Sequence, residues 1–300
     1  MHADTRYRVA VALMFVIPIL WSVNFLVARA ATGFIEPHTL ALLRWLVAGL
    51  LFMLGSVSEL RIHRHHIVKD WKRYLTLGAL GMWICGAWVY IGGRTTEAIN
   101  IALIYSTSPV MIVIFSAIWL KERFTVLQAW GVAFSLAGVM HVILKGQWGA
   151  LASVHFVPGD GWILAATASW TTYCLLLKRW DSPLSTSARL AVISFAGVLV
   201  LIPFALWEFL YSSLPVLTLK GFGLALAAAL LPGYGAYLMY TWMQNEMGAA
   251  RVSVALYLGP VYAAIMAWLV LAEPMRIYHA WGMALILPGI YLVTRPHYRR

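Results

Sequence analysis

Long apolar runs separated by short polar segments make up the chain from end to end. Ten of them reach the length of about 20 residues that a helix needs to cross a bilayer. They are Val9–Ala30, His38–Ser58, Lys72–Gly92, Glu97–Trp119, Thr125–Leu144, Gly159–Leu177, Ser185–Trp207, Leu219–Thr241, Met247–Leu271 and Ile277–Thr294. The segments between them are too short for a folded extramembrane domain. The pattern therefore predicts an all-α integral membrane protein with ten transmembrane helices.

The second half of the chain repeats the first at a constant offset. Pro109 matches Pro260, which sets the offset at 260 − 109 = 151. The same offset relates Leu120 to Leu271, Glu122 to Glu273, Ala129 to Ala280, Gly131 to Gly282 and Gly138 to Gly289. Because each copy holds an odd number of predicted spans, the two copies are expected to cross the membrane in opposite directions, around a central cavity. We predict two inverted five-helix repeats, residues 1–148 and 149–300, in one membrane domain.

Composition agrees with lipid as the main solvent of the chain. Hydrophobic residues make up 62% of it and charged residues 11%, which excludes an ordinary soluble domain. The net charge of +11 does not indicate a nucleic-acid partner, because the basic residues lie between apolar runs. Both cysteines, Cys85 and Cys174, fall inside apolar runs and are interpreted as buried thiols and not as a disulfide framework.

The distribution of Lys and Arg predicts the orientation of the chain. With the N-terminus inside the cell, sixteen of the 22 basic residues fall in cytoplasmic segments and five in outer segments. Lys and Arg favour cytoplasmic loops, so both termini are predicted to be cytoplasmic. A cleaved signal peptide is the alternative for the first span, since Arg6 and Arg8 precede it and Ala28-Arg29-Ala30 is similar to a cleavage site. The run is long for a signal core, which favours a retained helix.

Three motifs are informative together. They are Trp21-Ser22-Val23-Asn24-Phe25, Leu43-Arg44-Trp45 and the paired proline–glutamate–glycine patterns that begin at Pro109 and Pro260. These motifs resemble the ten-helix EamA-type branch of the drug/metabolite transporter superfamily. The resemblance covers essentially the whole chain and is nearest to bacterial exporters of aromatic amino acids. It implies a basket of helices in the bacterial inner membrane, with spans 1, 3, 4, 6, 8 and 9 lining the cavity. It implies no cofactor.

Mid-span aromatic and polar residues are the candidates for substrate binding. Tyr and Trp offer a flat apolar face with one polar group, which suits an aromatic solute. The candidates are Trp21, Asn24, Tyr90, Tyr105, Ser106, Ser108, Trp170, Tyr173, Tyr237 and Tyr257. Packing between helices is the alternative for each aromatic residue taken singly.

Arg44 is a formal charge placed within a predicted span. A guanidinium in hydrocarbon is costly unless it is paired or hydrated, so it is expected to face protein or water. Two interpretations remain open. Arg44 contacts a substrate carboxylate, or it binds backbone carbonyls or Glu36 within the protein.

Two prolines and two glutamates recur in both halves. Pro109 and Pro260 each remove a helix hydrogen bond, which predicts a kink that acts either as a hinge or as a purely structural bend. Glu122 and Glu273 lie in very short turns and are interpreted as anchors for backbone donors at the start of the next helix.

The absence of certain residue types and motifs from the sequence excludes or disfavours several functions. No Asp or Glu lies deep in a predicted span, which disfavours export of lipophilic cations through such a residue. The sequence has no HExxH, GxSxG or glycine-rich phosphate motif, so an enzyme is a remote alternative. The stretch Arg61–His66 is interpreted as a loop facing lipid headgroups and not as a metal site.

The combined prediction is an exporter of aromatic or other apolar amino acids that works by alternating access. A broad metabolite or drug exporter of the same fold is the alternative. The expected partners are the small solute and membrane lipids, and the glycine pairs allow helix packing either within one protomer or in a homo-oligomer.

Overall fold

A computed structural model gives the three-dimensional structure of the chain. It describes residues 3–96, 104–122, 124–153, 157–212, 218–259, 261–262, 265 and 276–294. The regular elements in these ranges are all helical. Seven helices are long and apolar enough to cross a membrane: Thr5–Asn24, Pro37–Leu54, Trp71–Gly92, Val126–Ile143, Thr186–Tyr211, Leu219–Met247 and Ile277–Thr294. The all-helical class is therefore confirmed for the described part of the chain.

The other three predicted spans also contain helices. Helix α10 (Pro158–Arg179) coincides with the predicted span Gly159–Leu177, but Asp160 and its Thr and Ser residues make it less apolar than the seven. The other two appear as shorter apolar helices, Ile104–Trp119 and Ala249–Leu258. The first contains α8 (Ser108–Trp119), and the second consists of α14 (Ala249–Ser253) and η4 (Val254–Leu258). Residues 97–103 and 266–271 of these predicted spans lie outside the described ranges.

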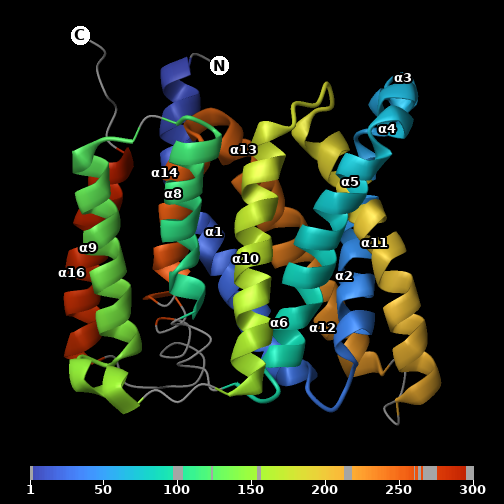
Figure 1. Ribbon diagram of the computed structural model, residues 1–300. Helices are drawn as coiled ribbons and strands as arrows, with labels where there is room; N and C mark the ends of the chain where they lie inside the picture. The colour runs from blue at the N-terminus through green and yellow to red at the C-terminus, as the bar shows by residue number, and fades with distance from the viewer. Residues whose placement is uncertain are drawn as a thin grey trace.

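Besides α10, five other long helices are continuous. They are α1 (Ala3–Ala31), α2 (Pro37–Leu54), α9 (Val126–Ile143), α11 (Thr186–Tyr211) and α16 (Ile277–Thr294). Short helices α3 (Val57–Ile62), α4 (Arg64–Lys69) and η2 (Trp148–Ser153) lie in the connections. The start of α1 lies at the same end of the molecule as α3 and α4 (Figure 1). The Tyr7 hydroxyl donates to the Thr294 carbonyl, which brings the start of α1 to the end of α16.

Two further long helices change their winding in the middle. Helix α5 (Trp71–Gly78) continues through the π-helical segment η1 (Ala79–Ile84) into α6 (Cys85–Gly92). Helix α12 (Leu219–Ala228) continues through the π-helical segment η3 (Ala229–Ala236) into α13 (Tyr237–Met247). The two π segments begin 229 − 79 = 150 residues apart, close to the sequence offset of 151. Since π-helical segments are rare and often occur at functional sites, their recurrence marks both helices for attention.

Helices α9 and α16 form an antiparallel pair at one edge of the molecule (Figure 1). Their glycines allow the two backbones to approach closely. A Cβ atom built on Gly131 would lie 2.6 Å from the Gly289 carbonyl oxygen, and one built on Gly138 would lie 2.7 Å from that of Gly282. The predicted glycine packing is thus observed within one protomer.

Glu122 anchors a helix start, although not that of the next helix along the chain. Its carboxylate accepts hydrogen bonds at 3.1 Å from the backbone N–H groups of Ala249 and Ala250, at the start of α14. The start of α9, the next helix, is capped instead by Thr125, whose hydroxyl accepts from the Gln128 N–H. The expectation for Glu273 falls outside the described residues.

Candidate functional site

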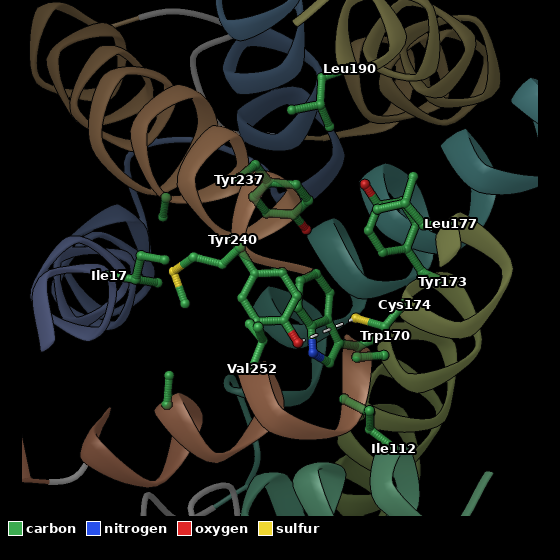
Figure 2. Packing of buried hydrophobic residues seen from close by; sticks show 14 of the residues in the cluster. Ile17, Ile112, Trp170, Tyr173, Cys174, Leu177, Leu190, Tyr237, Tyr240 and Val252 are labelled. Atoms are coloured by element: carbon green, nitrogen blue, oxygen red, sulfur yellow. Dashed lines mark hydrogen bonds between the residues drawn. The ribbon is translucent and has the colours of Figure 1, made fainter. Parts of the chain in front are cut away.

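Aromatic side chains from both halves of the chain meet between α1, α10 and α13. The ring centroid of Trp21 lies 5.6 Å from that of Trp170, edge to face, and 5.2 Å from that of Tyr240. Trp170 is 5.5 Å from Tyr237 and 5.6 Å from Tyr173. Figure 2 shows Trp170, Tyr173, Tyr237 and Tyr240 gathered in one region. We call these five residues the aromatic cluster.

Helical spacing explains why α10 and α13 each contribute a pair of rings. Trp170 and Tyr173 are three residues apart on α10, as Tyr237 and Tyr240 are on α13. Residues at this spacing share one face of a helix. Trp45 of α2 extends the cluster, since its ring lies 4.7 Å from that of Tyr237. The four rings from α10 and α13 are at most 5% exposed, whereas Trp21 is partly exposed.

The π-helical segment η1 is tied to the second half through its carbonyl groups. The Tyr237 hydroxyl donates to the Gly81 carbonyl at 3.2 Å, and the Ser169 hydroxyl donates to the Leu80 carbonyl at 2.8 Å. A Cβ atom at Gly81 would lie 2.7 Å from the Tyr173 ring, so only glycine allows this approach. The irregular backbone of η1 is thereby held against α10 and α13.

A polar triad lies beside the cluster and contains the buried cation. Arg44 Nη1 donates to Asn24 Oδ1 at 3.1 Å and to the Tyr90 hydroxyl at 3.2 Å. The Tyr90 hydroxyl in turn donates to Asn24 Oδ1 at 2.6 Å. Arg44, Asn24 and Tyr90 come from α2, α1 and α6, so the triad joins three helices of the first half.

The Arg44 guanidinium contacts only neutral groups in the described part of the chain. Its side chain is 4% exposed, and the guanidinium lies over the Trp45 ring, 4.6 Å from the centroid. Its Nε–H has no hydrogen-bond partner, and no described carboxylate lies within 4.0 Å of it. The interpretation that Arg44 holds Glu36 is wrong, because Glu36 accepts from Arg94 and Ser212.

The remaining predicted residues are more dispersed. Tyr105 packs against a buried group of residues that includes Tyr90. The Ser106 hydroxyl lies 3.8 Å from Met140 Sδ of α9. Ser108 is 1% exposed and Tyr257 is fully buried; neither hydroxyl has a hydrogen-bond partner among the described residues.

The break expected at Pro109 lies just before it. Residues 104–106 are helical, Thr107 forms a turn, and α8 begins at Ser108 with Pro109 in its first turn. Proline is well suited to a first turn, where its missing N–H costs no helical bond. Pro260 lies outside the described residues.

Sequence reasoning missed two members of this region as site residues, Trp45 and Tyr240. Tyr240 was detectable, because it lies three residues after Tyr237 on the same helix face. Trp45 follows Arg44 directly, and only the packing of α2 against η3 and the first residue of α13 shows that its ring faces Tyr237.

The sequence is similar to one transporter family over most of its length. The model of the EamA-like transporter family matches residues 8–144 and, a second time, residues 157–295. The chain belongs to the EamA-like transporter family. Together with the seven apolar helices, this membership identifies a multi-pass membrane protein of a transporter family.

Curated relatives in the EamA-like family cover nearly the whole chain. The uncharacterized transporter YyaM of Bacillus subtilis is 26% identical, covering 89% of this chain and 87% of its own length. An uncharacterized transporter of Archaeoglobus fulgidus is 27% identical, with coverages of 92% and 95%. The S-adenosylmethionine/S-adenosylhomocysteine transporter of Chlamydia trachomatis is 22% identical, with coverages of 97% and 90%.

The fold is also similar to a solved crystal structure. The TM-score is 0.73 at 20% sequence identity, and the match covers 95% of this chain and 96% of the other. At this identity the likeness establishes the fold alone.

Proposed function

We propose that this member of the EamA-like family exports aromatic or other apolar amino acids by alternating access. The aromatic cluster supports the proposal most directly. Trp21 comes from the first half of the chain, and the other four rings come from the second. A site at the interface between two halves changes its exposure when the halves rock against each other. Edge and face contacts from several rings suit an aromatic side chain.

The proposal includes ten spans in two inverted repeats, residues 1–148 and 149–300. The geometry of α9 and α16 supports it, because α9 at residues 126–143 and α16 at residues 277–294 are related by the offset of 151 and pack antiparallel. Two copies of one unit that run in opposite directions are expected from an odd number of spans in each unit.

The proposed orientation places both termini in the cytoplasm of a bacterial cell, with the protein in its inner membrane. In support, the start of α1 lies at the same end as α3 and α4, which belong to the most basic connection (Figure 1). Basic residues favour the cytoplasmic side.

A broader metabolite exporter is the second candidate, and the relative from Chlamydia trachomatis favours it. S-adenosylhomocysteine carries an aromatic adenine and an amino-acid group. The aromatic cluster offers an adenine the same edge and face contacts that it offers a phenyl or indole ring. The two candidates therefore differ in substrate size and not in the type of contact.

Flux measurements in proteoliposomes test both candidates. The flux of each labelled compound into proteoliposomes is compared with its flux into protein-free liposomes. The compounds are phenylalanine, tryptophan, threonine, S-adenosylhomocysteine and a cationic dye. The proposal expects phenylalanine and tryptophan flux above that control, and weak dye flux. Flux of S-adenosylhomocysteine without phenylalanine or tryptophan flux would replace the proposal with the second candidate. Repeating the assay with an imposed pH gradient separates proton coupling from facilitated diffusion.

A further inference from the structure

The buried guanidinium of Arg44 lacks a partner of opposite charge among the described residues. Within the hydrocarbon region a cation without an anion is expensive, and such residues mark substrate or ion pathways. Arg44 has five N–H donors. Nη1 uses Asn24 Oδ1 and the Tyr90 hydroxyl, both neutral oxygens, and Nε–H has no acceptor. The arrangement therefore holds both spare positive charge and spare hydrogen-bonding capacity.

A second unused donor lies next to Arg44. The indole N–H of Trp45 is buried and has no hydrogen-bond partner among the described residues. Gly86 lets the indole pack directly against its backbone, since a Cβ atom there would lie 2.9 Å from Trp45 Nε1. Buried donors are normally paired, so two neighbouring unpaired ones beside a cation are suited to binding an acceptor from a solute.

Trp45 links the cation to the aromatic cluster. The Trp45 ring contacts both, at 4.6 Å from the Arg44 guanidinium carbon and 4.7 Å from the Tyr237 ring. Trp21 and Asn24 provide a second link, because residues three apart on α1 lie on one face of the helix. Trp21 and Asn24 are both partly exposed, so this face of α1 is not fully covered by protein.

We infer that Arg44 binds the carboxylate of an aromatic solute whose ring lies on the aromatic cluster. The inference rests on the proposed function and adds that the carboxylate is required for recognition. An aromatic amino acid holds its ring and carboxylate apart by a short carbon link, which matches a cation adjacent to a group of rings. A guanidinium and a carboxylate form strong, charge-assisted hydrogen bonds. One buried cation suits the single charge of a carboxylate better than the multiple charge of a phosphate ester.

Three related ligands isolate the contribution of the carboxylate. Phenylalanine carries an amine and a carboxylate, 3-phenylpropionate only the carboxylate, and phenylalaninamide the amine with a neutral amide. Binding of each to the purified full-length protein in detergent is measured by titration calorimetry. We expect phenylalanine and 3-phenylpropionate to bind at least ~10-fold more tightly than phenylalaninamide, the difference of one charge-assisted hydrogen bond.

Asn24→Asp tests the role of Arg44 without leaving a buried cation unpaired. The new carboxylate has the shape of the amide and accepts from Arg44 at the position of Asn24 Oδ1. It therefore supplies internally the anion that the solute supplies in the wild type. Phenylalanine is expected to bind N24D no better than phenylalaninamide does, while the protein unfolds at an equal or higher temperature. Asn245→Asp is the matched control, because the same change at an exposed position of α13 leaves the preference intact.

The outcomes separate this inference from the proposed function. Equal binding of phenylalanine and phenylalaninamide to the wild type would overturn the inference, as would a carboxylate preference retained by N24D. Binding of none of the three ligands would overturn it too. A carboxylate preference without flux in proteoliposomes would remove the proposed transport of phenylalanine and leave the anion site in place. Flux of phenylalanine without a carboxylate preference in binding would support the proposed transport and overturn the anion site at Arg44.

Discussion

Ser135 donates a hydrogen bond from its hydroxyl to the carbonyl of Ile286, at 3.4 Å, and the two residues are 151 positions apart. They therefore occupy the same place in the two copies of the repeated unit. Gly131 contacts Gly289 on one side of this bond, and Gly138 contacts Gly282 on the other. Exchanging the two copies turns each glycine contact into the other. This reciprocity supports the proposed relation between two inverted repeats.

Gly131→Ala is predicted to destabilise the protein, because its Cβ atom meets the Gly289 carbonyl oxygen at 2.6 Å. Forcing a methyl group into a packed interface typically costs about 1–3 kcal/mol. Thermal unfolding in detergent measures the effect. Gly161→Ala in α10 is the control, since a Cβ atom at that position would have nothing within 4 Å. Equal stability of both variants would show that α9 and α16 adjust their spacing without cost.

Trp21→Ala is predicted to reduce the initial rate of phenylalanine flux by about tenfold or more, because it removes the ring of the first half from the aromatic cluster. Trp21→Phe is expected to retain part of the rate. Trp130→Ala on α9 is the control, since that side chain is 59% exposed and lies outside the cluster. Folding of each variant is checked by size-exclusion chromatography. An unchanged rate in Trp21→Ala would assign Trp21 to helix packing.

Glu122→Ala is predicted to lower stability by about 0.5–2 kcal/mol, the usual cost of losing a helix cap. Its carboxylate accepts from the Ala249 and Ala250 N–H groups, and it joins the end of α8 to the start of α14. Gly248→Ala perturbs the same junction in a second way, because Gly248 has φ +87° and its Cβ would lie 2.9 Å from Glu122 Oε1. Wild-type unfolding temperatures in both variants would contradict a capping role.

Glu59 is predicted to make stability depend on pH. Hydrogen bonds from the side chain and backbone N–H of Ser185 lower the pKa of Glu59 below its ordinary value of 4.5. The folded protein then binds fewer protons than the unfolded chain, so acidification favours unfolding. The contribution is complete above pH 4.5 and is lost as the pH falls through the lowered pKa. Glu59→Gln removes this dependence, which unfolding temperatures recorded across an acid series reveal. An identical acid profile in both proteins would contradict it.

Much of the fold follows from local patterns in the sequence. The apolar runs predicted the all-helical class, and seven helices in the described ranges are long and apolar enough to cross a membrane. The count of ten spans stays a prediction. The glycines of α9 and α16 were assigned to close packing from their spacing alone. Glu122 was identified as an anchor, but the helix that it caps begins 127 residues later in the chain. A short turn in the sequence indicates that donors must be satisfied, and it does not indicate which helix start lies nearby.

The candidate site could also be predicted only in part from the sequence. Trp21, Trp170, Tyr173 and Tyr237 were predicted, and the structure brings them together. Ser106, Ser108 and Tyr257 were predicted on the same grounds, and no ring or hydrogen-bond contact in the described ranges joins them to the cluster. Mid-span position is a property of one helix, whereas contact depends on how two helices are rotated against each other.

The sequence by itself determined the helical class, the duplicated halves, the uneven distribution of basic charge and the presence of a cation within a span. Those features depend only on composition and on the spacing of residues along one chain segment. Hydrophobic burial and helix geometry relate both directly to local structure. Only the tertiary structure decided that Arg44 meets Asn24 and Tyr90 instead of Glu36, and that Trp45 connects it to the aromatic cluster. The physical reason is that helical periodicity fixes which residues share a face, while the packing of side chains between helices fixes which faces meet.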